Sequence, residues 1–223
     1  WSKNVDPISY IELDGRPAFK MAIHRHGERW FLYTAHFWHS GLSVVDITDP
    51  LAPRQVGFIP GPPNTWTLQV QAADGLLITS QERILDGWGG VPDKPFGEGF
   101  LIWDLTDPEK PRQLGHHRTG YRGTHRNYYD GGRYVHATAL IEGYEGHIYQ
   151  IVDIADPANP VEVSRWWYPG QWTGGGEAGV KPSTFLHGGA YIKDDRAYLP
   201  YTAGGFVILD ISEVTHPKLI SDL

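Results

Sequence analysis

One short pattern is repeated along this 223-residue chain and constrains its fold more than any other feature. Each copy is an apolar run that ends around an aspartate and is followed by a turn. Three copies are complete and the fourth is modified, and they cover residues 41–61, 99–120, 147–170 and 205–223. The aligned aspartates lie 49 to 58 residues apart and are Asp46, Asp104, Asp153 and Asp210. Repeats of this length are typical of arrays and propellers.

The chemistry of one copy predicts a strand, a tight turn and an outer edge strand. The β-branched run around Asp46 is too short for a helix and is bounded by turn residues, which favours a buried strand. Asp49 can accept a hydrogen bond from the backbone two residues on, and Pro50 presets the first turn position. The same Asp-Pro-x-x-Pro spacing recurs in the next two copies, whereas the last keeps only Pro217.

A second pair of strands is predicted upstream of every copy, with turn residues between its members. The pairs are 19–23 with 30–34, 67–71 with 76–80, 124–128 with 133–138, and 189–193 with 196–201. Two hairpins per period make one four-stranded blade, and blades arranged radially leave only short strand edges. The blades of this single predicted body are 18–61, 62–120, 121–170 and 171–223. Residues 1–17, with the sequence YIEL at 10–13, are predicted to supply an outer strand of a preceding blade.

Composition excludes several classes of function. The formal net charge is −7, and no basic run of the kind that follows a phosphate backbone is present, so no nucleic-acid partner is predicted. No apolar stretch approaches the length that spans a membrane, so no membrane partner is predicted either. The chain has no cysteine, which excludes disulfides, thiolate chemistry and metal sites built on cysteine.

The repeat copies GLSVVDITDP, FLIWDLTDP, YQIVDIADP and FVILDISE resemble the LVIVD repeat of a family of bacterial β-propeller proteins. The segments HFWHSGLSVVD, GTHRNYYDGGRYVH and WWYPGQ are also similar to an uncharacterised subfamily whose members are longer than this chain. The resemblance implies an all-β propeller of four-stranded blades, with about four blades in this chain. These blades are expected to be part of a seven- or eight-bladed ring, completed by missing sequence, a second polypeptide or a second copy.

The propeller implied by this resemblance places several histidines at one mouth of the central channel. The segments leading into the innermost strands lie on the same face as the loops that join second to third strands. His125 and His187 lead into innermost strands, and Gln69 is the corresponding residue of another blade. His24 and His26 are expected on the opposite face. The histidines at or just beyond the ends of second strands are His36, His39 and His136.

Imidazoles that converge from several blades predict a divalent transition metal, which would be Fe, Mn or Zn. The predicted ligands are His125, His136, His187, His36 and His39. The carotenoid oxygenases and the selenium-binding proteins are similar in plan, since each blade places one channel-facing histidine around a metal. The alternative is that each histidine is a hydrogen-bonded residue of a polar loop.

Other polar and aromatic residues are predicted beside these histidines. Glu82 lies in the loop region after a second strand, where it could act as a general base beside a metal. Its alternative interpretation is a solvated loop residue. Arg126 and Tyr128 follow His125 and are the other candidate catalytic residues. Two long loops, 81–98 and 171–183, carry Gly, Pro and Trp and are expected to be functional or mobile. The candidate substrate-binding residues are Trp38, Gln69, Trp88, Trp172 and Tyr201.

Three functions from different classes remain open at this point. The first is a metal-dependent enzyme, a hydrolase or lyase acting on a small aromatic substrate, with oxygen chemistry as a variant because imidazole ligands serve both. The second is a non-catalytic propeller that binds a protein or peptide. The third is a carbohydrate-binding module with exposed tryptophans as platforms. No nucleophile elbow, P-loop or dinucleotide-binding motif is present.

Overall fold

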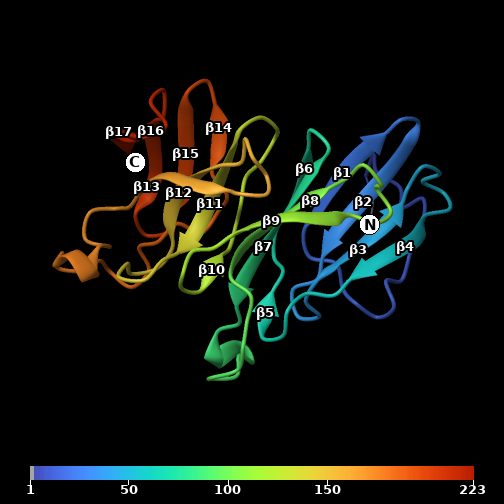
Figure 1. Ribbon diagram of the computed structural model, residues 1–223, viewed down its shortest axis with the longest axis horizontal. Coiled ribbons are helices and arrows are strands. Elements are labelled where there is room, and N and C mark those ends of the chain that lie inside the picture. The colour runs from blue at the N-terminus through green and yellow to red at the C-terminus, as the bar shows by residue number, and fades with distance from the viewer. Residues whose placement is uncertain (1–2) are drawn as a thin grey trace.

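The computed structural model describes residues 3–223, in which four antiparallel blades follow one another along the chain (Figure 1). The first blade has the strand order β1-β2-β3-β4, with β1 at Met21–His26, β2 at Arg29–Ala35, β3 at Leu42–Asp46 and β4 at Arg54–Ile59. The fourth has the order β14-β15-β16-β17, with β14 at Tyr191–Lys193, β15 at Arg196–Tyr201, β16 at Gly205–Asp210 and β17 at Lys218–Asp222.

The second and third blades are joined into one nine-stranded sheet. The second blade contains β6 at Val70–Ala73, β7 at Leu76–Arg83, β8 at Gly99–Asp104 and β9 at Arg112–His117. The third contains β10 at Gly123–Thr124, β11 at Tyr134–Leu140, β12 at Ile148–Asp153 and β13 at Val161–Trp166. The short strand β5, at Thr65–Trp66, pairs with the end of β7. The joint forms because β10 pairs with both β7 and β11.

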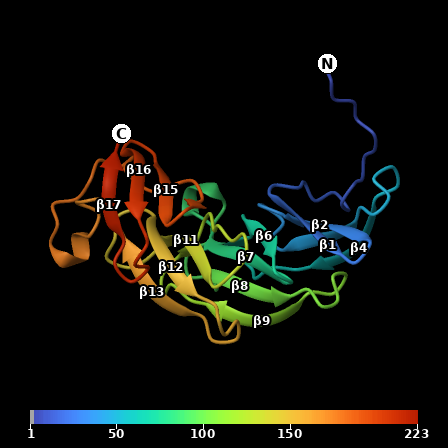
Figure 2. The ribbon, with the colours of Figure 1, turned by 90° about the horizontal axis from the view of Figure 1, so that it is seen from above.

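The four blades are arranged along an arc, with the first and last blades at its two ends (Figure 2). Buried apolar side chains fill the spaces between consecutive blades. One core combines Phe31 and Tyr33 of β2 with Leu77 of β7, and another combines Tyr149 of β12 with Leu199 of β15. The all-β propeller with about four blades in this chain is therefore confirmed.

The repeated aspartate has a structural role that explains the sequence pattern. In every blade it ends the third strand and accepts a hydrogen bond from the backbone N–H two residues on, a turn that aspartate favours. The acceptor oxygens are Oδ1 of Asp46, Asp104, Asp153 and Asp210, at 2.8 to 3.0 Å from the donors. The Asp-Pro turn that follows uses the same device, since Asp49 Oδ1 lies 3.0 Å from the N–H of Leu51.

Two predicted strands differ from the structure. Residues 10–13 form no strand; residues 1 and 2 of the predicted segment 1–17 lie outside the described residues. The predicted strand 124–128 is reduced to β10 and an isolated bridge between Tyr128 and His136. The intervening backbone still bonds to β11, since the His125 N–H donates to the Thr138 carbonyl at 2.8 Å.

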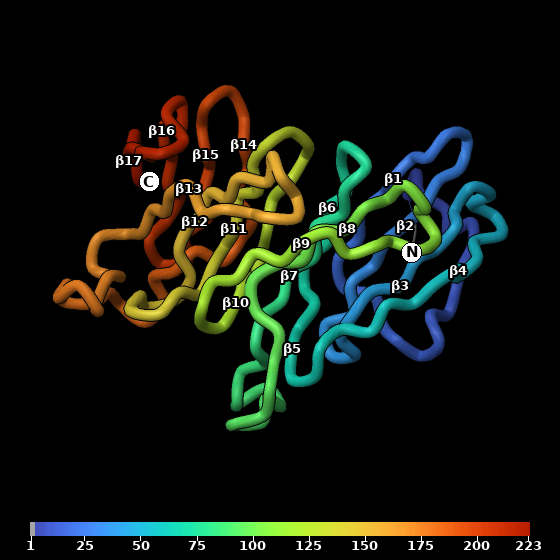
Figure 3. Tube along the Cα trace, in the orientation of Figure 1, coloured from blue at the N-terminus to red at the C-terminus, as the bar shows by residue number. Residues whose placement is uncertain are grey.

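Helical structure within residues 3–223 is confined to two short 3-10 turns, η1 at Asp86–Trp88 and η2 at Thr173–Gly175. Each lies in one of the two long loops, and the loop that carries η1 projects from the bottom of the molecule in Figure 3. Among the described residues no helix is long and apolar enough to cross a membrane.

Candidate metal and substrate site

Glu82 lies near the end of β7, where that strand extends beyond its hairpin with β6. Its backbone is paired with Trp66 of β5 and with Gly123 of β10. Gly123 has a φ of 98°, and a Cβ at this position would clash with the Gln81 carbonyl, so glycine permits the close approach of β10 to β7. The Glu82 side chain is 2% exposed and is therefore withdrawn from solvent.

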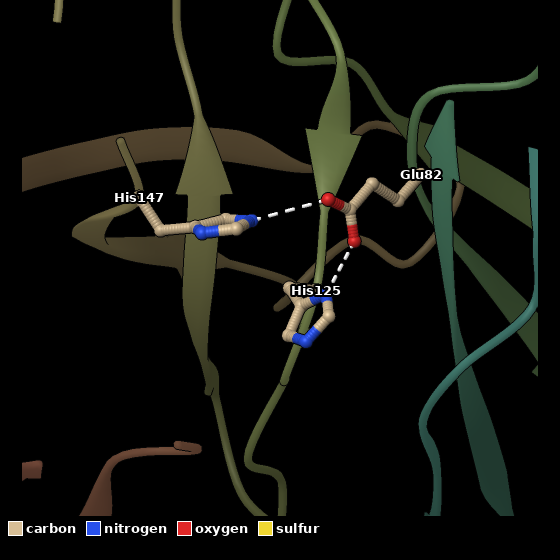
Figure 4. A group of neighbouring side chains, drawn as sticks. All are labelled: Glu82, His125 and His147. Carbon is tan, nitrogen blue, oxygen red and sulfur yellow. Dashed lines mark hydrogen bonds and ion pairs between the residues drawn. The ribbon is translucent and has the colours of Figure 1, made fainter. Parts of the chain in front are cut away.

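Two histidines of the third blade contact the Glu82 carboxylate (Figure 4). His125 follows β10, and His147 immediately precedes β12. Glu82 Oε1 lies 3.2 Å from Nε2 of His147, and Oε2 is hydrogen-bonded to Nδ1 of His125. A third histidine, His187, stacks on His125 with ring centroids 5.1 Å apart. The predicted pair His125 and His187 thus lies together, with Glu82 beside it.

The electrostatics of the group assign a role to each atom. Burial alone would raise the pKa of Glu82, but the hydrogen bonds from His125 and His147 outweigh burial and lower its pKa to about 2. Burial lowers the pKa of His125, against the opposing effect of Glu82. The lowered pKa of Glu82 favours its ionised form, and the lowered pKa of His125 favours its neutral form. A neutral His125 that donates from Nδ1 to the ionised Glu82 agrees with both shifts. Nε2 of His125 then carries a lone pair, and it is buried without a hydrogen-bond partner among residues 3–223.

These residues fit a divalent transition metal. The potential ligand atoms of Glu82, His125 and His147 all lie within 4.8 Å of one another. Imidazole and carboxylate together are ligands that Zn, Fe and Mn accept. The unpartnered Nε2 of His125 offers a second point of attachment beside His187, with Glu82 then orienting the imidazole from behind. Glu82 is a ligand in the first arrangement and a hydrogen-bond partner of a ligand in the second.

An aromatic cavity of about 500 Å³ opens onto this group. Phe37 and Trp66 form a stacked pair in its wall, with ring centroids 4.8 Å apart, and Trp88 of η1 lies edge-on to Trp66. The apolar lining comes from the first, second and fourth blades and comprises Phe19, Phe37, Trp66, Leu85, Trp88 and Phe185. The polar lining comprises Glu82, His125, Arg126, His147 and His187. We refer to this space as the aromatic cavity.

Three predicted metal ligands are not part of the group. Both ring nitrogens of His36 are already used, by the Pro17 carbonyl at 3.0 Å and by the Ser43 hydroxyl at 2.8 Å. Nδ1 of His136 is bonded to the Tyr149 hydroxyl at 2.6 Å inside the third blade. His39 is exposed to solvent and does not line the aromatic cavity.

The predicted substrate-binding residues are divided among several places. Trp38 stacks on Trp88 with ring centroids 5.9 Å apart, so these two lie together beside the aromatic cavity. Gln69 lines a neighbouring polar cavity, as does the candidate catalytic residue Tyr128, whose hydroxyl donates to Asp130 at 2.7 Å.

Two other candidates lie outside the aromatic cavity. Trp172 packs on Tyr144 and Trp167 because its long loop folds back over the third blade. Tyr201 is buried in β15 against Trp166 and Tyr168, where it belongs to the core between the third and fourth blades.

His147 was not among the predicted ligands, although the sequence contained a signal for it. It stands at the end of the loop between the second and third strands of its blade. Glu82 and His39 were predicted from the corresponding loops, between the second and third strands of their own blades. The residue was missed because it begins a repeat copy and was assigned to the repeat rather than to the channel mouth.

Comparison with known proteins agrees with the fold described above. A family model for the LVIVD repeat matches residues 30–58, 149–166 and 190–222, which lie in the first, third and fourth blades. The chain therefore carries LVIVD repeats, and the resemblance in its sequence is confirmed. No curated protein matches this sequence.

Several solved structures share the architecture at low sequence identity. A protein from Lactobacillus plantarum has a TM-score of 0.62 at 7% identity over 92% of this chain and 70% of that chain. BamB from Moraxella catarrhalis has a TM-score of 0.54 at 11% identity over 93% of this chain. An exo-beta-1,3-galactanase from Phanerochaete chrysosporium has a TM-score of 0.53 at 10% identity over 92% of this chain. This chain spans 50% and 49% of the lengths of BamB and the galactanase. These similarities define a fold alone.

Proposed function

We propose that this protein is a metal-dependent enzyme, a hydrolase or lyase that acts on a small aromatic compound. The observation that supports it most is a buried carboxylate between two imidazoles, at the wall of a cavity lined by aromatic rings. A divalent Fe, Mn or Zn ion there would polarise a substrate oxygen and lower the pKa of a bound water. The aromatic lining favours a flat organic substrate over a small polar one.

The protein's own residues supply orientation and water exclusion. Glu82 fixes the tautomer and the direction of His125, so that its Nε2 lone pair faces away from the carboxylate. Phe37, Trp66 and Trp88 line the cavity and remove water from around a bound ring. A metal in a water-depleted cavity interacts more strongly with a substrate oxygen than the same metal does in bulk solvent.

Activity assays with and without metal test this proposal. The purified protein is treated with chelator, restored with Zn, Mn or Fe(II), and assayed with small aromatic esters, ethers and alkenes. Oxygen consumption is followed in parallel. We expect turnover only with restored metal, and a loss of about 10- to 100-fold in Glu82→Gln, since loss of a group that orients a metal ligand typically costs this much. Glu142→Gln, at an exposed glutamate, is the matched control and should retain activity.

Each result has a defined meaning. Turnover that survives chelation would contradict the metal-dependent function. Metal-dependent oxygen consumption without hydrolysis would favour the oxygenase variant over a hydrolase or lyase. Binding of sugars that is unaffected by chelator would favour the carbohydrate-binding alternative, for which the stacked pair Trp38 and Trp88 offers an exposed platform.

We further propose that a second copy of this chain completes the ring. Ala22 of β1 packs toward the second blade, so its neighbours Met21 and Ile23 face the other way, and they are 60% and 56% exposed. In the fourth blade Leu199 packs toward the third blade, and the opposite face carries Tyr198 stacked on Phe206, with Tyr191 beside Tyr198 at the channel edge, where it also contacts Tyr128. Blades normally bury both faces, so each outer face fits the outer face of another blade.

A further inference from the structure

A second cavity, of about 430 Å³, adjoins the aromatic cavity. The two share Arg126 and His187 as lining residues. A larger share of its lining is polar than in the aromatic cavity, and it includes Lys20, Gln69, Gln71 and Asn127. No carboxylate lines it. The cavity therefore presents cations and amide groups, and the nearest carboxylate that acts on Arg126, that of Glu82, lines the aromatic cavity instead.

Arg126 is half-buried between the two cavities. Its guanidinium carbon lies 5.3 Å from the centroid of the Phe19 ring, so one face of the group is covered by an aromatic wall. The side chain forms no hydrogen bond or ion pair with any residue in the described part of the chain. Most buried or partly buried arginines are paired, as Arg29 is with Asp46 and Glu109. Burial lowers the pKa of the Arg126 guanidinium and the charge of Glu82 opposes this effect without a hydrogen bond, so an anion bound directly to Arg126 would stabilise its charged form.

Lys20 adds a second positive charge to the lining of the same cavity. It is exposed and forms no ion pair with residues 3–223, and its ammonium lies 5.8 Å from the Phe19 ring. The Phe19 ring thus has two cations close to it, one of which, Arg126, also lines the aromatic cavity. An anion at Arg126 would face an ammonium and neutral amides, with no carboxylate in the lining of that cavity.

We propose that Arg126 binds the carboxylate of an aromatic acid whose ring occupies the aromatic cavity. A guanidinium presents two parallel N–H donors that match the two oxygens of a carboxylate. The ring would then lie among Phe37, Trp66 and Trp88, and the acid group would point toward the polar cavity. This assignment rests on the proposed function, because it names the substrate class of that site, and it makes Arg126 a substrate-binding residue.

Ligand binding by the purified protein tests the assignment without an activity assay. Phenylacetate and phenylacetamide have the same ring and similar shape and differ in charge. Their dissociation constants are measured by titration calorimetry, with quenching of tryptophan fluorescence as a second readout. We expect phenylacetate to bind at least about tenfold more tightly than the amide, as a charge-assisted pair provides. In Arg126→Met this preference should disappear while the affinity for the amide stays within about twofold.

Arg122→Met is the matched control, because Arg122 lies four residues earlier and packs on Tyr121 without lining either cavity. It should keep the full preference for the acid. Arg126→Lys should recover only part of it, because an ammonium lacks the paired donors of a guanidinium. Equal affinity of the wild-type protein for acid and amide would overturn the assignment. So would a preference that persists in Arg126→Met, or a failure of both ligands to bind.

A metal could also bind a carboxylate, so each titration is repeated after chelation and the metal content of every sample is measured. Preference for the acid that is lost on chelation but kept in Arg126→Met would make the metal its partner and overturn the assignment. A preference that depends on Arg126, in natively purified protein that contains no metal and takes up none in titration, would support the acid subsite and contradict the metal-dependent function. Bound metal without any preference for the acid would support the metal site and overturn the acid subsite.

Discussion

At the scale of single residues, Glu82 and His136 show how surroundings decide the role of a buried polar side chain. Glu82 accepts hydrogen bonds from two histidines beside a cavity, where a metal or substrate can reach the group. Nδ1 of His136 is hydrogen-bonded to the Tyr149 hydroxyl, and burial lowers the pKa of His136 to about 4. Its neutral form is therefore part of the fold rather than of the site.

The depressed pKa of His136 predicts an acid-sensitive contribution to stability. The unfolded chain takes up the proton near the ordinary pKa of 6.5, whereas the folded chain takes it up only near 4. The stabilisation is thus complete above pH 6.5 and is lost as the pH falls toward 4, by up to about 3 kcal/mol. Urea unfolding at several pH values should show a flatter profile for His136→Gln, which keeps a hydrogen-bond partner for Tyr149. Identical profiles would contradict this role.

At the scale of elements, the junction of β7 and β10 positions the site. β7 carries Glu82, and β10 leads into His125, so the contact of these two side chains depends on how closely the strands approach. Gly123 permits this approach through its positive φ and the absence of a side chain. A change in the backbone here would move the carboxylate relative to the imidazole.

Gly123→Ala should therefore separate site geometry from general stability. A methyl group there meets the Gln81 carbonyl, whereas one at Gly120, which also has a positive φ of 73°, meets no atom within 4 Å. Both substitutions should cost roughly 1 kcal/mol for the positive φ, and Gly123→Ala should cost more because the backbone must move to relieve the clash, so metal affinity is compared only in variants that circular dichroism shows to be folded. Only Gly123→Ala should also weaken metal binding, by about tenfold or more, measured by titration of the chelated protein with Zn. Equal metal affinities in the two variants would contradict the proposed role of the junction.

The repeat and the blade geometry account for the parts of the fold and site that the sequence predicted correctly. The repeat predicted the blades because each copy carries its own local determinants, namely a β-branched run, an aspartate that bonds the backbone, and a proline turn. The channel-mouth argument also selected Glu82 and His125, which the structure brings together. Both predictions depend on short-range chemistry and on the general geometry of a propeller.

The remaining part of the site could not be predicted because it depends on side-chain direction. Position near the end of a second strand selected both His36 and His136, yet their rings point into the protein and find hydroxyl partners there. The irregular backbone after β10 changes the alternation of faces, so counting residues does not give the direction of a ring. Trp172 was misplaced for a similar reason, since its loop folds onto Tyr144.

At the scale of the whole molecule, the outer faces of the first and last blades predict assembly. If a second copy completes the ring, the mass in solution should be twice the chain mass of 25.0 kDa. Light scattering after gel filtration measures it. Ile23→Asp places a charge on the outer face of β1 and should shift the protein toward monomer. Val161→Asp, at a 60% exposed position of β13, is the control and should not. A monomeric wild-type protein would contradict this assembly.

The central claim is that the group at Glu82 holds a metal, and elemental analysis of the natively purified protein tests it most directly. We expect close to one equivalent of Fe, Mn or Zn per site, lost in the double variant His125→Ala/His147→Ala. His24→Ala/His26→Ala removes two histidines of β1 that do not line the aromatic cavity and should leave the metal content unchanged. Folded wild-type protein that contains no metal and takes up none in titration would contradict the account, as would equal loss in both double variants.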